Sequence, residues 1–287
     1  MADEALNEAA EEEAEAAFER LGLDPDADDE GDNCLANMPQ TVAWITDKTK
    51  RPAARFKMAE QLQLLFYKMD QDKSRAWITK SATLWLDAIF DILKEPDDKF
   101  DAKDHWGYDK GLQRCGLHMM QVVEFLIATA EDDVMVQALL AAVGPFAEKV
   151  AASGIDMRPV KPGKPEGPSA VRLEVVSGVI GFGPKDSFAG PSGKGTAIPP
   201  DYIQGLLTLI SAPCTASLPT LRQRVSGILM MISVGGGNNT QVLYPHAQKI
   251  FDAIRAGNDD LSGALSTIMT TDTNFYRETQ AVFDNNL

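Results

Sequence analysis

The sequence predicts an all-α protein made of stacked helix pairs or of a two-lobed helical bundle. Apolar residues recur at the spacing of amphipathic helices from about residue 50 to the end of the chain. A short motif, Val-Ser-Gly followed by two aliphatic residues, begins at Val176 and again at Val225. The only strand-like stretch, 171–180, contains the first copy of this motif. Its match to the helical pattern of 221–234 predicts that it is a helix too.

The N-terminal segment carries nearly all of the net charge. Residues 1–33 hold 14 acidic residues and one basic residue, Arg20, so they account for 13 of the 15 negative charges. Because like charges repel, residues 1–37 are predicted to be an acidic mobile arm and linker. In a second interpretation, residues 5–21 form a helix whose thin apolar stripe docks on a basic partner. The residues expected to contact that partner are Glu11, Glu12, Glu13, Phe18 and Leu21.

An N-terminal helical lobe is predicted over residues 38–157, with the folded part beginning near Met38. The helices expected in this lobe are 56–69, 77–93, 112–126 and 134–150. Glu95-Pro96 is expected to stop the second of them, and a polar loop, 97–110, follows. Gly144-Pro145 is expected to break or kink the fourth, because proline lacks an amide hydrogen and clashes with the preceding turn.

A C-terminal set of helical repeats is predicted over residues 170–287. The linker before it, 158–169, contains four prolines. Each copy of the Val-Ser-Gly motif is followed by a glycine-rich loop and then by a proline, Pro200 or Pro245, at the start of a further helix, a position that tolerates proline. The helices expected here are 171–180, 202–210, 221–234, 247–254, 261–270 and 274–283.

Repeated helix–loop–helix units of about 40–50 residues are typical of α-solenoids. The stretches 206–210, 221–234 and 242–254 resemble consecutive helices of armadillo units, and residues 50–283 resemble the armadillo/HEAT superfamily as a pattern. The resemblance implies a partner-binding face made by the second helices of the pairs. Peptide-binding armadillo proteins carry an asparagine ladder, whereas this sequence has Met231 and Thr267 at the corresponding places. Scaffolding through surface patches is therefore expected, rather than clamping of a peptide backbone.

The motifs that could carry chemistry are incomplete, and we predict no catalytic residue, cofactor site or metal site. Gly190–Thr196 resembles a phosphate-binding loop, but Gly195 stands where a hydroxyl residue should follow the lysine. It is predicted to be a flexible loop. Cys115 and His118, even with Asp104 and His105 upstream, do not have the spacing of a zinc site. His246 is expected near a helix start.

Cysteine usage and the N-terminus predict a cytoplasmic protein. The three cysteines are odd in number and lack a CxxC pair, as expected for thiols in a reducing compartment. The acidic N-terminus does not match a signal peptide. No apolar run was found that approaches the ~20 residues of a membrane-spanning helix, so no membrane association is expected.

The predicted function is that of a non-catalytic interaction scaffold or adaptor whose partner is another protein, with self-association possible. The alternative is a self-assembling helical shell protein of the viral nucleocapsid or coat type, which would bind RNA between two lobes. Nucleic acid is expected as a partner only under this alternative, because binding phosphates requires a clustered basic surface. The candidate contacts are then Lys48, Lys50, Arg51, Arg55, Lys57, Arg222 and Arg224.

Overall fold

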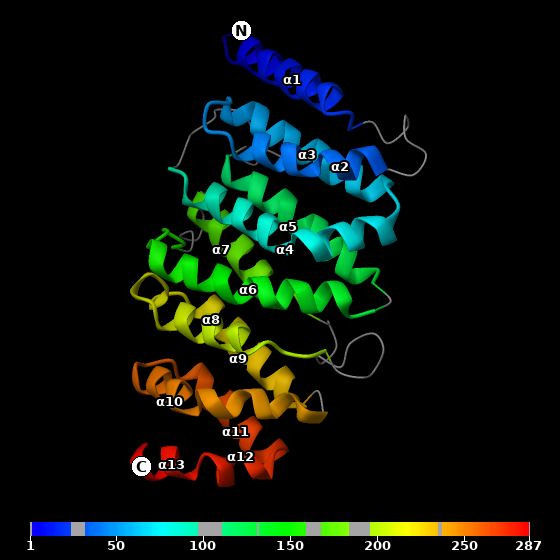
Figure 1. Ribbon diagram of the computed structural model, residues 1–287. Helices are drawn as coiled ribbons and strands as arrows, with labels where there is room; N and C mark the ends of the chain where they lie inside the picture. The colour runs from blue at the N-terminus through cyan, green and yellow to red at the C-terminus, as the bar shows by residue number, and fades with distance from the viewer. Residues whose placement is uncertain are drawn as a thin grey trace. The chain divides into compact units, whose positions relative to one another are not determined.

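The structure is a computed structural model that describes residues 2–23, 32–96, 111–130, 132–158, 168–183, 196–234 and 237–286. The described residues form helices joined by short connections and contain no strand (Figure 1). The all-α prediction is therefore confirmed. The chain packs as two units, unit 1 with residues 1–129 and 157–175, and unit 2 with residues 130–156 and 176–287.

Unit 1 is a set of helices that pack in layers. Its helices are α1 (Ala2–Arg20), α2 (Asp32–Thr46), α3 (Pro52–Lys68), α4 (Gln71–Lys94), α5 (Gln113–Ala128) and the first part of α7 (Pro168–Ile180). Helix α1 packs on α3, α3 on α5, and α2 on α4 (Figure 1). The indole of Trp85 is fully buried in this core and donates to the carbonyl of Met119 at 3.0 Å. The predicted stop of α4 at Glu95 is confirmed.

Unit 2 contains the end of α7 and the remaining helices. They are α6 (Val134–Ser153), α8 (Pro200–Ser211), α9 (Pro219–Val234), α10 (Ala247–Arg255), α11 (Asp260–Thr271), α12 (Thr273–Glu278) and α13 (Gln280–Asn286), with 3-10 turns at Pro213–Thr215 and Gly237–His246. Helix α6 packs on α8, α8 on α10, and α9 on α11. Pro200 is the first residue of α8, as predicted. The expected last helix is divided at Thr279, whose hydroxyl donates to the carbonyl of Phe275 at 2.6 Å.

Helix α6 is continuous through Gly144-Pro145, so the predicted break does not occur. The glycine instead permits a close approach of two helix backbones. A Cβ atom on Gly144 would collide with the backbone of Asp201 in α8, and one on Gly205 would collide with the backbone of Gly144. The pair of glycines therefore brings α6 and α8 into direct backbone contact.

The predicted mobile arm and linker of residues 1–37 differ from the structure where it is described, and residues 24–31 of the linker lie outside the described residues. Residues 2–20 form α1, and Ala10, Ala14 and Ala17 are buried. Helix α2 begins at Asp32, ahead of the start near Met38 that the sequence predicted. The buried face of α2 includes Cys34. The sequence analysis assigned this first part of α2 to the linker because acidic residues come just before it.

The packing units also divide the chain elsewhere than at the predicted linker between the lobes. Helix α6, predicted in the N-terminal lobe, belongs to unit 2 because it packs on α8. Residues 159–167 of the predicted linker lie outside the described residues, as do the loop 97–110 and residues 190–195 of the glycine-rich loop. The three cysteines, all described, form no disulfide.

Among the described residues, α6 is long and apolar enough to cross a membrane by length and composition alone. The sequence analysis did not identify it. Of its most apolar stretch of 18 residues, 56% is buried inside the protein. The core helices of water-soluble proteins meet the same criterion, so α6 carries no conclusion about a membrane.

Candidate functional site

An open groove of about 480 Å³ crosses three helices of unit 2. These helices, α6, α8 and α10, are the second members of three predicted pairs, and they lie side by side. The groove is lined by Glu148, Ala151 and Ala152 from α6, Leu207, Thr208, Ser211 and Ala212 from α8, and Lys249 and Asp252 from α10. Most of the exposed lining is apolar, with charged groups at the two outer helices. This combination is typical of a binding surface.

Hydrogen bonds organise the polar side of the groove. The Gln204 amide accepts from the Nζ of Lys249 and donates to the hydroxyl of Thr208 at 3.1 Å. On α10, the amide of Gln248 donates to Asp252 Oδ1 at 2.9 Å. The positive charge of Lys249 is thus held by an amide, while the rim also carries the carboxylates of Glu148 and Asp252. The lining residues of the groove therefore include two carboxylates and one cation.

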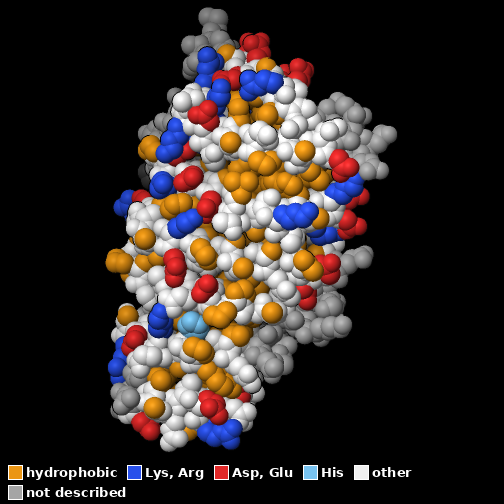
Figure 2. Space-filling view, in the orientation of Figure 1, with side chains coloured by type: hydrophobic (Ala, Val, Ile, Leu, Met, Phe, Trp, Pro, Cys, Tyr) orange, Lys and Arg blue, Asp and Glu red, His pale blue; other side chains and the backbone are white. Residues whose placement is uncertain are grey.

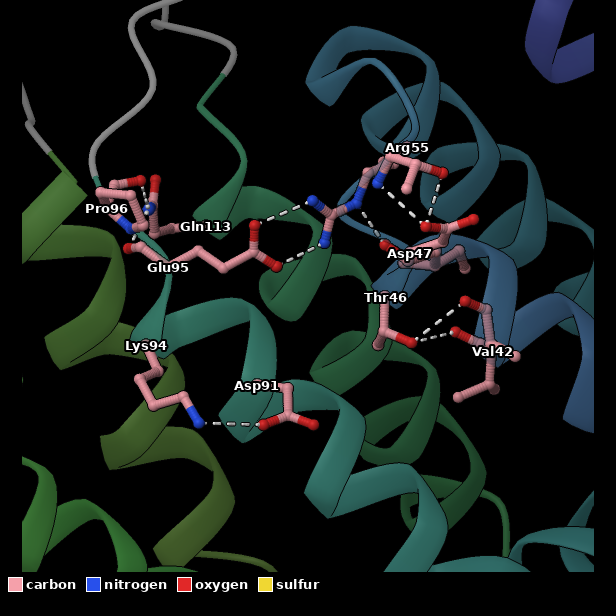
Figure 3. Close-up of polar contacts among 12 residues, drawn as sticks. Val42, Thr46, Asp47, Arg55, Asp91, Lys94, Glu95, Pro96 and Gln113 are labelled. Carbon is pink, nitrogen blue, oxygen red and sulfur yellow. Dashed lines mark hydrogen bonds and ion pairs between the residues drawn. The ribbon is translucent and has the colours of Figure 1, made fainter.

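Arg55, a candidate nucleic-acid contact, is buried, and that assignment is wrong. Its side chain is 1% exposed and forms a bidentate pair with Glu95, at 2.9 Å from Nη1 and 2.6 Å from Nη2 (Figure 3). Its Nε donates to the carbonyl of Ile45. Around the same turn, Arg172 donates to the carbonyls of Leu93 and Glu95 at 2.8 and 2.7 Å. Burial of a charge requires such a partner, so Arg55 ties the start of α3 to the end of α4.

Two other candidate nucleic-acid contacts lie against candidate partner-binding residues. Lys57 Nζ is 3.1 Å from Glu11 and 3.2 Å from Glu60, while Arg51 Nε is 3.7 Å from Glu13. Burial acts to lower the pKa of Lys57, but Glu11 and Glu60 outweigh it and the pKa is raised. Acidic and basic side chains are interspersed over α1–α3 in Figure 2. The structure therefore brings together two sets of residues that the sequence assigned to different partners.

The remaining candidates are divided between the units. In unit 1, Lys48 is exposed and Lys50 Nζ lies 5.8 Å from the ring centroid of Trp44. In unit 2, Arg222 lies 3.9 Å from Asp260, and Arg224 is exposed beside Gly181. Among the other candidate partner contacts, Glu12 is exposed, and Phe18 and Leu21 are half-buried.

Three titratable side chains that were considered for chemistry, and that the structure describes, lie wholly or partly inside the protein. Burial raises the pKa of the Cys115 thiol to about 12, which suppresses the nucleophilic thiolate. Burial lowers the pKa of His118 to about 4, and its Nδ1 lies 2.6 Å from Gln63 Oε1. Burial also lowers the pKa of His246. Within the described residues no cluster of His, Cys, Asp or Glu has the composition of a metal site.

Unit 1 exposes an apolar face over α2 and α4. Figure 2 shows hydrophobic side chains gathered in a band at this level. Leu84 of α4 is 42% exposed, and Pro39 and Ala43 of the neighbouring α2 are exposed as well. Contiguous exposed apolar area of this kind marks protein interaction surfaces.

The sequence analysis identified none of the groove residues as a site. The sequence shows only that the second helices of successive pairs are amphipathic. It does not show which polar residues of different helices come together in a groove. Comparisons of the chain with protein-family models, with curated proteins and with solved structures find no match. The resemblance to the armadillo/HEAT superfamily therefore stays a prediction.

Proposed function

We propose that this protein is a non-catalytic scaffold or adaptor, built on stacked helix pairs, that binds a segment of another protein in the groove across α6, α8 and α10. The single observation that carries the proposal is this groove, because it crosses three neighbouring helices and joins apolar lining to an ordered polar side. Burial keeps Cys115 in its unreactive thiol form, with the pKa raised to about 12, and this supports binding rather than catalysis.

The chemistry of the groove favours one kind of partner segment. Short apolar side chains fit over Ala151 and Leu207. A lysine or arginine next to them would reach Glu148 and Asp252. Among the described lining residues, these two carboxylates face the single cation of Lys249, which leaves one negative charge for the partner to balance. We therefore expect an apolar segment flanked by a basic residue.

A peptide-display selection with a matched pair of variants tests the proposal. Ala152→Arg places a long cation in the groove, whereas Ala141→Arg makes the same change at an exposed position of α6 that does not line it. Random peptides selected on the wild-type protein should share the apolar and basic pattern. They should bind Ala152→Arg at least about tenfold more weakly, a loss of about 1.4 kcal/mol, and bind Ala141→Arg unchanged.

The same variants extend the test to the native cell. A protein that co-purifies with the wild type and with Ala141→Arg, but not with Ala152→Arg, would be the partner. Peptides and co-purified proteins that ignore Ala152→Arg would refute the groove as the binding site. Three of the seven candidate contacts do not favour the RNA-binding alternative, because Arg55 is buried and Arg51 and Lys57 lie beside carboxylates.

A further inference from the structure

Helix α1 packs on α3, and the fully buried side chains among those of α1 that the structure describes are small. Ala10, Ala14 and Ala17 are buried at successive helical turns. Alanine methyl groups bury little apolar area, so this stripe stabilises the docked helix less than a stripe of leucine or valine would. The small side chains let the two helices approach closely but add little to the stability of the contact.

Charge complementarity supplies the specificity of this contact. We call Arg51 and Lys57 the basic edge of α3. Glu13 lies 3.7 Å from Arg51, and Glu11 lies 3.1 Å from Lys57. One side chain of each pair is about half exposed, Arg51 at 55% and Glu11 at 48%, while Glu13 and Lys57 are 31% and 25% exposed. Ion pairs this exposed to solvent are screened and contribute little to stability.

The C-terminal end of α1 is anchored more firmly than the rest of the helix. Gly22 takes a left-handed conformation with φ of 62°, which ends the helix, and Leu23 beyond it is fully buried. The amide of Asn37 in α2 donates to the carbonyl of Leu21 at 2.8 Å. Helix α1 therefore resembles a tethered ligand of α3, anchored at its C-terminal end and packed on α3 along its buried alanines.

We propose that the basic edge of α3 is a docking site for an acidic, alanine-faced helix of a partner protein, and that α1 occupies this site in the absence of that partner. The inference rests on the proposed role of the protein as a protein-binding scaffold. Helix α1 itself defines the chemistry of the partner: carboxylates opposite Arg51 and Lys57, and small side chains that let the two helices approach closely. As a tethered competitor, α1 also sets a threshold for the partner's affinity.

A labelled peptide with the sequence of residues 2–23 serves as the probe. It competes with the tethered α1 of each full-length variant for the basic edge of α3. Glu11→Lys with Glu13→Lys mismatches the tethered helix and leaves the basic edge intact. Arg51→Glu with Lys57→Glu reverses the edge. Fluorescence anisotropy at low salt should show the peptide binding the first variant about tenfold more tightly than the wild type. Binding to the second variant should be lost, and a peptide carrying Glu11→Lys and Glu13→Lys should restore it.

Rescue by the matched charge reversal excludes a simple loss of folding, and far-ultraviolet circular dichroism of each variant provides a second check. The proposal is overturned if no variant binds the peptide, or if reversal of the basic edge leaves binding unchanged. It is also overturned if the wild type forms dimers that either charge reversal dissolves, since a second copy would then be the occupant. The groove variants at Ala152 and Ala141 lie in unit 2, so failure of either proposal is visible separately.

Discussion

Replacing Arg55 by alanine should destabilise unit 1 far more than any other loss of a basic residue on α3. The substitution removes the bidentate contacts with Glu95 and the hydrogen bond to the carbonyl of Ile45. Glu95, only 8% exposed, would keep a buried carboxylate without its guanidinium. Breaking one side of a buried ion pair costs about 3–5 kcal/mol. With a urea dependence of about 2 kcal/mol per molar, the unfolding midpoint should fall by about 1.5–2.5 M.

Tryptophan fluorescence is the appropriate assay, because all four tryptophans lie between residues 44 and 106 of the sequence, and the three that the structure describes, Trp44, Trp77 and Trp85, belong to unit 1. Trp85 is fully buried next to Phe66, with ring centroids 5.6 Å apart, so its exposure reports loss of this core. Urea unfolding followed by the emission shift of the tryptophans therefore measures unit 1 without a contribution from unit 2.

Two comparisons make the result decisive. Arg51→Ala removes an arginine whose side chain is 55% exposed and should change stability by no more than about 0.5 kcal/mol. Arg55→Met combined with Glu95→Leu removes both charges and should recover most of the loss, because the desolvation cost of the pair disappears with it. The reasoning is refuted if Arg55→Ala shifts the midpoint no more than Arg51→Ala does.

Two further predictions concern helix contact and pH. Gly205→Ala should destabilise unit 2 by about 2–3 kcal/mol, because the added Cβ would collide with the backbone of Gly144, whereas Gly227→Ala has open space around it and should be neutral or stabilise by up to about 1 kcal/mol. Urea unfolding followed by circular dichroism measures both changes, and equal effects of the two variants would contradict the close approach of α6 and α8. The pKa of His118 is about 4 in the folded state and about 6.5 in the unfolded state, so below pH 6.5 the unfolded state binds a proton that the folded state does not. The free energy of unfolding should therefore be highest above pH 6.5 and fall by about 3 kcal/mol at most as the pH drops towards 4. Tryptophan-detected unfolding between about pH 7 and 5 should show this loss in the wild type and less of it in His118→Gln, and parallel curves would refute it.

Helix positions were largely predictable because they depend on local spacing. The apolar periodicity predicted helices at 56–69, 77–93 and 202–210, and the structure has α3, α4 and α8 there. Proline chemistry predicted the start of α8 at Pro200. Each of these features is decided within a few turns of one helix, so neighbouring residues carry the information.

Helices α1 and α2 were not predicted as packed elements, for an electrostatic reason. Counted along the chain, the acidic residues of 1–33 repel one another and indicate a solvated arm. In three dimensions, Glu11 and Glu13 lie beside Lys57 and Arg51, more than 35 positions later. A count of charges along the chain cannot show this pairing, because the basic partners lie far away in the sequence.

The residues of the groove and the burial of Arg55 were likewise decided by tertiary structure. Arg55 was predicted to be a surface base because charged residues are mostly exposed, and only Glu95, 40 positions away, makes its burial tolerable. Glu148, Thr208 and Asp252 share a groove because α6, α8 and α10 lie side by side. The sequence by itself determined which segments are helical and which face of most of them is apolar, since both follow from spacing along the chain. Packing alone decided which charges meet, because Coulomb interactions and hydrogen bonds depend on distance through space.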